Sequence, residues 1–176
     1  LDYLNEINTD KPALYCSRTK LIDEKGRPIG LSPQFKKSPS FQNSIVQSIA
    51  GGNTMVINNK ALKIVSMAAK NSHIISHDWL IYLVISGVGG FIKYDQWPSV
   101  LYRQHQNNGI GSNNSFGAKC VRLFKLIRGD FRDWINWNLV TLDKIDIYLS
   151  KEAKQTINEF YCKLTKYKTI KLISVP

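Results

Sequence analysis

An apolar run from Trp79 to Ile92 constrains the fold of this chain more than any other feature. A helix that crosses a membrane needs about 20 predominantly apolar residues. This run is shorter, and it is interrupted at Gly87, Gly89 and Gly90. A short run with almost no polar positions is typical of a helix surrounded by other elements. We therefore predict a buried helix here, and the rest of the fold must cover it.

Composition limits the class of protein and of partner. The chain has 176 residues, 43% of them hydrophobic, which fits one globular domain. The formal charge of +11 favours partners that carry phosphates, such as nucleic acids or anionic membranes. The cysteines Cys16, Cys120 and Cys162 are widely spaced, so neither a disulfide framework nor a zinc site is indicated. Because the first residues show no secretory signal pattern, we expect a cytoplasmic location.

Local patterns predict an α/β or α+β core in the order β-β-α-β-α-α-β-β, followed by a helical tail. Strands are predicted at 13–17, 20–30, 54–57, 91–95 and 99–105, and the second breaks into a turn at Lys25 and Gly26. Helices are predicted at 41–49, 59–70, 118–137 and 150–168, besides the apolar helix, which begins at Asp78. The segments 32–40 and 106–117 are expected to be loops.

Asp78 places a carboxylate at the start of the apolar helix. An aspartate there accepts hydrogen bonds from free backbone N–H groups and stabilises the helix by about 1 kcal/mol. The same carboxylate is suited to act as a general base, because the helix dipole keeps it ionised and the apolar helix gives it a rigid mounting. The two roles are compatible. The neighbouring His77 either orients a substrate or faces solvent.

Arg103 and His105 lie two residues apart in a predicted strand, so their side chains share one face. Arginine offers a planar donor fork that suits a diphosphate. Histidine offers a ring nitrogen to a phosphate oxygen or a metal ion. The alternative is the polar, solvent-facing side of an edge strand.

Three stretches together resemble a known family: SIAGGNTMVINNKAL, SHDWLIYLVISGVGGFIKYD and SVLYRQHQNNGIGSN. In this order and spacing they are similar to the second half of bacterial family-two glycosyltransferases, in particular the rhamnosyltransferase-like members. The upstream stretch KPALYCSRTKLIDEKGRPIG extends the resemblance, which covers roughly residues 4–114. The resemblance divides the chain into an acceptor-side part of the catalytic domain, 1–114, and a basic, amphipathic helical tail, 115–176.

The resemblance implies a GT-A fold, which is α/β and Rossmann-like with a mixed sheet. It also implies inverting transfer from a nucleotide-sugar donor, for which dTDP-rhamnose is a candidate, to a glycan or lipid-linked acceptor in polysaccharide biosynthesis. A divalent metal, Mg or Mn, is expected as cofactor. In this family the aspartate at the start of the helix after the central strand is the catalytic base, and Asp78 matches it. Arg103 and His105 would lie near the donor diphosphate, with His105 as a metal ligand.

The same resemblance implies a sugar and acceptor pocket formed by Gly52, Asn53, Thr54, His77 and Trp79. Asn53 stands where the family pattern has a cysteine.

Family members open with a βαβ nucleotide-binding half that ends in an acidic D-x-D metal motif, which this sequence does not contain. We therefore expect about a hundred further residues before Leu1 in the native protein. We also expect this chain alone to hold the nucleotide sugar and the metal poorly.

The tail carries a basic row, Lys119, Arg122, Lys125 and Arg128, beside the apolar residues Val121, Phe124 and Ile127. It is either a solvated face above a core contact or a helix that rests on the inner face of the cell membrane. A non-catalytic basic binding or scaffold module is the alternative function. Nucleic acid is disfavoured as the partner, because the tail aromatics form no known base-reading motif.

If the tail rests on a membrane, the protein will float with liposomes that contain anionic phospholipid but not with neutral liposomes, because basic side chains are attracted to anionic headgroups. Flotation in a density gradient measures this, and added salt should release the protein. Absence from both floating fractions would exclude the membrane interpretation.

Overall fold

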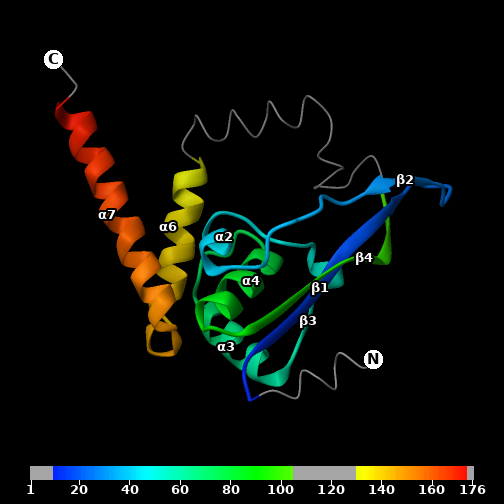
Figure 1. The fold of residues 1–176 in the computed structure, drawn as a ribbon, viewed down its shortest axis with the longest axis horizontal. Coiled ribbons are helices and arrows are strands. Elements are labelled where there is room, and N and C mark those ends of the chain that lie inside the picture. Colours follow the sequence, from blue (N-terminus) through cyan, green and yellow to red (C-terminus); the bar gives the residue numbers. More distant parts are fainter. Residues whose placement is uncertain (1–9, 105–129, 174–176) are drawn as a thin grey trace.

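The computed structural model describes residues 10–104 and 130–173. Within them, a four-stranded mixed sheet lies beside a group of helices, and two further helices lie on the far side of that group (Figure 1). This confirms the predicted α/β class with a mixed sheet, and it is consistent with part of a Rossmann-like core.

The central strand is β1 (Ala13–Ile22). Strand β4 (Phe91–Arg103) runs parallel to β1 along its whole length. The short strands β2 (Pro28–Leu31) and β3 (Val56–Ile57) pair antiparallel with opposite ends of β1, and together they occupy its other edge. The parallel pair requires a long crossover, and the helices between β1 and β4 supply it.

The prediction of separate strands at 13–17 and 20–30 is wrong in its boundaries. Pairing with β4 carries β1 through to Ile22, so residues 18 and 19 continue the strand. The predicted turn is confirmed, although it begins earlier. The Asp23 carboxylate accepts hydrogen bonds from the backbone N–H groups of Lys25 (2.9 Å) and Arg27 (2.8 Å), and Gly26 takes a φ of 82°.

Residues 91–103 form one strand where two, 91–95 and 99–105, were predicted, and residue 105 lies outside the described residues. Asp95 pairs with Ser17 and Pro98 pairs with Arg18, so two residues of β4 bulge out between them. Pro98 has no backbone N–H, and a bulge is a position where a strand tolerates proline. The predicted break at Gln96, Trp97 and Pro98 is therefore an irregularity within a continuous strand.

Three helices form the crossover: α2 (Phe41–Val46), α3 (Asn59–Ala69) and α4 (His77–Gly87). Two of them have side-chain caps, since Ser40 accepts from Asn43 N at the start of α2 and Asn58 accepts from Ala61 N at the start of α3. The predicted strand residue Thr54 instead belongs to the 3-10 turn η1 (Gly52–Thr54).

Helix α4 confirms the prediction of a buried helix. The helix contacts α2, α3, β1 and β4. Its fully buried side chains point in several directions, and they are Tyr82, Leu83, Val84 and Ile85. The chain then turns sharply into β4 at Gly89, with φ of 69°, and Gly90. A Cβ on Gly90 would lie 2.6 Å from the carbonyl oxygen of Pro12, so only glycine permits this approach.

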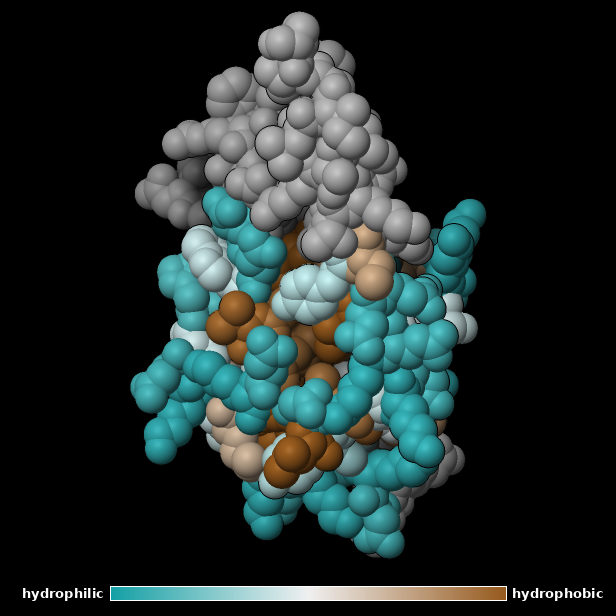
Figure 2. Space-filling view, turned by 90° about the vertical axis from the view of Figure 1, so that its left-hand side faces the viewer, coloured by the Kyte–Doolittle hydropathy of each residue, from teal (hydrophilic) through white to brown (hydrophobic). Residues whose placement is uncertain are grey.

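Two long helices follow, α6 (Asp130–Asp143) and α7 (Lys151–Ile173), joined through the 3-10 turn η2 (Asp146–Tyr148). Helical structure in the tail is confirmed where the chain is described. Core side chains from these helices and from the connection between them join the cluster around α4: Leu139, Leu142, Ile145, Leu149 and Ala153. Figure 2 views the molecule from the side of α6 and α7, and it shows apolar side chains at the centre of this face with polar side chains around them. No helix among the described residues has both the length and the hydropathy of a membrane span.

The basic row at 119–128 and the predicted boundary at 114/115 lie outside the described residues.

Replacing Leu83 with alanine should lower the free energy of unfolding by about 2–5 kcal/mol, because the side chain is fully buried and its loss leaves a cavity in the core. The matched control is Leu62→Ala on α3, where the leucine is 51% exposed and the loss should be far smaller. Urea denaturation of both variants measures the difference. Equal losses would show that α4 is not the centre of the core.

Candidate functional site

The candidate site lies at the start of α4. Ser76 is the N-cap residue, in extended conformation, and its side chain makes no capping hydrogen bond. Asp78 stands in the first turn instead, where its Oδ1 accepts a hydrogen bond of 3.0 Å from Trp79 N. Within the described part of the chain, the second carboxylate oxygen of Asp78 has no hydrogen-bond partner. One oxygen therefore serves the helix, while the other remains available to a ligand.

The 51–54 turn beside α4 is fixed to the central strand by Thr54. The Thr54 hydroxyl accepts from Ser17 N at 3.3 Å. It also lies 3.1 Å from the Ser17 carbonyl and 3.0 Å from the Gly51 carbonyl, and its single proton can be donated to either. Thr54 and Ser17 are both buried. This side chain therefore ties the turn to the middle of β1.

The turn and the helix meet where Gly52 faces His77. A Cβ on Gly52 would overlap the Nε2 atom of the His77 imidazole and lie 2.7 Å from its Cδ2. The structure therefore brings two of the predicted site residues, Gly52 and His77, into contact, while Thr54 lies on the same turn and Asp78 follows His77 in the chain. Asn53 is exposed on the same turn. The roles of these residues remain predictions, and the contact between Gly52 and His77 is the observation.

Trp79, which was expected in the same pocket, lies in the core. It is 6% exposed, and its Nε1 donates a hydrogen bond of 2.6 Å to the Ser44 carbonyl of α2. Its ring meets Trp134 of α6 edge to face, with the centroids 6.2 Å apart. Consecutive helical residues point about 100° apart, so the residue after Asp78 turns inward and holds the helix start against α2 and α6.

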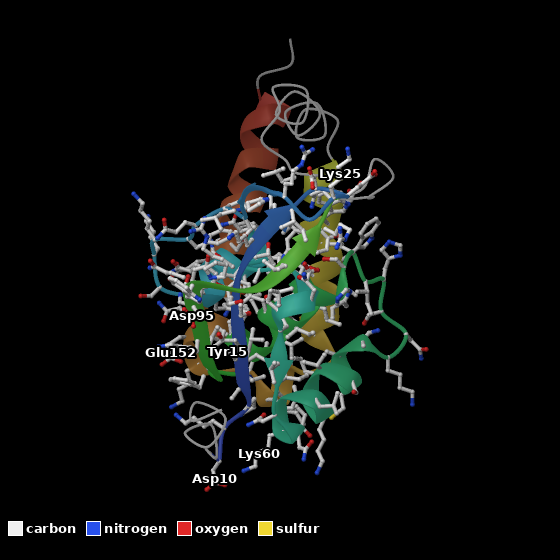
Figure 3. The ribbon with its side chains drawn as sticks, turned by 90° about the vertical axis from the view of Figure 1, so that its right-hand side faces the viewer. Asp10, Tyr15, Lys25, Lys60, Asp95 and Glu152 are labelled. Carbon is white, nitrogen blue, oxygen red and sulfur yellow. The ribbon has the colours of Figure 1, made fainter. Side chains whose placement is uncertain are left out.

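Arg103 lies at another end of the sheet. It pairs with Ile22, five residues or about 16 Å along β1 from Ser17. Its guanidinium donates to the carbonyl oxygens of Glu24 (2.6 Å) and Asp23 (3.4 Å) in the β1–β2 turn. Lys25 marks this turn in Figure 3, at the end of the sheet opposite Asp10 and Lys60. His105 lies outside the described residues, so the diphosphate and metal roles of this pair remain predictions.

Among the described residues, no group of three or more His, Cys, Asp or Glu side chains is placed to hold a metal ion. The donor set that Mg or Mn needs is therefore not met by residues 10–104 and 130–173.

Neighbouring residues Tyr15 and Cys16 of the central strand have shifted pKa values. Burial raises the pKa of the Cys16 thiol to about 12, so this cysteine stays protonated at neutral pH and is no nucleophile. Burial, followed by the nearby Asp95 carboxylate, raises the pKa of Tyr15, whose hydroxyl donates to Asp95 at 3.1 Å. Figure 3 shows Tyr15 and Asp95 side by side on β1 and β4.

Sequence patterns did not reveal what holds the segment that leads into α4. Lys144, just after α6, donates from Nζ to the carbonyl oxygens of Lys70 (2.9 Å) and Asn71 (2.6 Å) and to Ser72 Oγ (2.8 Å). Trp137 packs on His73 with ring centroids 4.0 Å apart. These contacts join residues more than sixty positions apart, and no local pattern carries that information.

Comparison with known proteins gives a partial likeness. The chain is 45% identical over 47 residues to dTDP-rhamnosyl transferase RfbG of Shigella flexneri. The match covers 27% of this chain and 16% of that protein, or about a sixth of the relative's length. No family model matches the chain. No solved structure matches it either. These findings support a glycosyltransferase-like family, and they specify neither substrate nor mechanism.

Replacing Thr54 with valine should destabilise the protein by about 1–3 kcal/mol, because the buried Ser17 N–H loses the hydroxyl it donates to. Thr54→Ser keeps the hydroxyl and is the matched control. Chemical denaturation measures stability, and hydrogen exchange at the Ser17 amide reports the local opening. A valine variant as stable as the serine variant would contradict the anchoring role.

Proposed function

We propose that the protein is an inverting glycosyltransferase, in which this chain supplies the acceptor side of the catalytic site. The donor is a nucleotide sugar, with dTDP-rhamnose the first to test, and the acceptor is a glycan or a lipid-linked saccharide. The partial identity to a dTDP-rhamnosyl transferase supports this class of reaction. The observation that carries the proposal is the Asp78 carboxylate, which stands in the first turn of α4, directly after the residue that meets Gly52, with one oxygen free within the described structure.

In the proposed reaction, Asp78 acts as the general base. Its free oxygen accepts the proton of an acceptor hydroxyl while that hydroxyl oxygen attacks the anomeric carbon of the sugar. A new glycosidic C–O bond forms as the bond to the diphosphate breaks, and the nucleotide diphosphate leaves with the electron pair. Because attack and departure occur on opposite faces, the configuration at the anomeric carbon inverts.

The surroundings of Asp78 suit this role. The first turn of a helix carries partial positive charge, which attracts an anionic side chain. The Trp79 N–H fixes one carboxylate oxygen, and the Trp79 indole bonds to Ser44 and holds this turn in the core. A base held in this way loses little motion when the acceptor arrives, which favours transfer.

The site that would bind the nucleotide-sugar donor depends on Arg103 and His105, which the described structure does not bring together. We propose that Arg103 and His105 stabilise the negative charge that grows on the departing diphosphate. A divalent metal would supply further charge stabilisation there. Because the described residues do not fit a metal site, no step is assigned to it.

We place the reaction at the cytoplasmic face of the cell membrane, where a lipid-linked acceptor would be found and where the basic tail residues would meet anionic lipid. The competing proposal is a basic scaffold or binding module without catalysis. In that protein the carboxylate of Asp78 would serve only the helix, and an amide would replace it without functional loss.

Replacing Asp78 with asparagine in the full-length native protein should lower transfer about 10²–10⁴-fold, because an amide cannot accept the acceptor proton at neutral pH. Folding should be preserved, since asparagine is also favoured at helix starts. Release of dTDP from dTDP-rhamnose, with native membranes as the acceptor source, measures transfer.

The matched control is Glu152→Gln, which neutralises the first-turn carboxylate of α7 and should leave transfer unchanged. Wild-type transfer by the Asp78→Asn protein would remove Asp78 as the base and favour the scaffold proposal.

A further inference from the structure

We propose that His77 and Gly52 form one positioning unit, in which the His77 ring sets the spacing between the 51–54 turn and the Asp78 carboxylate. This inference rests on the proposed function and goes beyond it. His77 is a positioning residue here, because it acts through the placement of its neighbours on the site.

The first observation is that space, and not backbone conformation, requires glycine at position 52. Among the described residues, the glycines with positive φ are Gly26, Gly30 and Gly89. Gly52 is not one of them, so an alanine there would have an ordinary backbone. A Cβ at position 52 would nevertheless overlap the Nε2 atom of His77. The glycine therefore provides room for this imidazole ring.

The adjacent glycine behaves differently. A Cβ on Gly51 would lie 2.7 Å from the Oδ1 of Asn53, the end of a flexible and exposed side chain that can move away. It would not meet His77. The two glycines therefore differ in which side chain an added Cβ would meet, Asn53 or His77, and Gly51 serves as a control for Gly52.

The second observation is that each side of the contact is fixed independently. On the turn side, Thr54 ties the backbone to Ser17 in the central strand. On the helix side, Trp79 bonds to Ser44, and α4 is buried in the core. The ring therefore lies between two anchored parts, and a larger group at position 52 would displace the ring and not the backbone.

The third observation concerns the nature of the contact. Within the described part of the chain, neither ring nitrogen of His77 has a hydrogen-bond partner, and the side chain is exposed. The ring therefore meets Gly52 through packing alone, and its loss should cost little folding stability. Its effect should appear in the geometry of the site.

Geometry of this kind acts on rate more than on affinity. A shift of about 1 Å in a catalytic group lowers the rate by as much as 10²-fold. Binding of the donor sugar should depend far less on the spacing between the turn and the carboxylate. Changes in the His77–Gly52 contact should therefore lower kcat and leave the KM for the donor nearly constant.

The test is a double-mutant cycle in the full-length protein with the variants Gly52→Ala, His77→Ala and the two combined. We expect each single variant to lower kcat for dTDP release about 10-fold to 10²-fold. We expect the double variant to be no worse than His77→Ala, because the alanine at 52 acts only by displacing a ring that is no longer present. Gly51→Ala should lower kcat less than Gly52→Ala does, and His77→Gln should recover part of the kcat lost in His77→Ala through a side chain of similar reach.

Two kinetic outcomes would overturn the inference: a double variant whose loss equals the product of the single losses, or a Gly52→Ala protein with wild-type kcat. The third readout needs no substrate. The ring proton resonances of His77 should shift in Gly52→Ala and stay in place in Gly51→Ala, and unchanged resonances in Gly52→Ala would also overturn it.

These readouts separate the two proposals. If Asp78→Asn abolishes transfer while the His77–Gly52 cycle is additive, the positioning unit fails and the proposed function stands. If the Asp78→Asn protein transfers at the wild-type rate, or wild type itself releases no dTDP, the proposed function fails. In that case the positioning role falls with it, and the ring resonances show only whether the contact exists.

Discussion

The burial of α4 is the constraint on which the rest of the structure depends. A helix with apolar side chains on nearly all sides needs neighbours on all sides, and α2, α3, α6 and the sheet supply them. The sheet contributes Leu14 and Cys16 from one face of β1. Each of these elements is held in place mainly by what it covers, so their positions follow from the position of α4.

Because α4 is buried, the position of its first turn at the surface is also fixed. The ring of Trp79 faces inward and Asp78 lies one residue before it, so the same turn carries an anchor and the carboxylate that we propose as the base. The 51–54 turn reaches this end because Thr54 ties it to β1, which packs on α4 as well. The 51–54 turn and the start of α4 are therefore held by the same core. The proposed proton transfer needs groups held at a fixed distance in this way.

Sequence reasoning succeeded where a feature is local. The apolar composition of 79–92 predicted α4, and the Lys25–Gly26 turn followed from its residue types. It failed where pairing between distant residues decides, as in the extension of β1 through Arg18 and the continuity of β4 across Pro98. Of the pocket expected from the family resemblance, the structure shows the contact between Gly52 and His77, and the pocket itself stays a prediction. The inward direction of Trp79 depends on helix packing that no motif encodes.

The packing of α6 determines how this chain can change over evolutionary time. A segment tethered only by a loop can be exchanged by recombination with little effect on its neighbours. Helix α6 cannot be exchanged in this way, since Leu139 and Leu142 pack in the core around α4. Lys144, just after α6, also donates a hydrogen bond to the Lys70 carbonyl at the end of α3. A foreign C-terminal segment would have to reproduce these contacts, so α6 and the helices it covers should be inherited together.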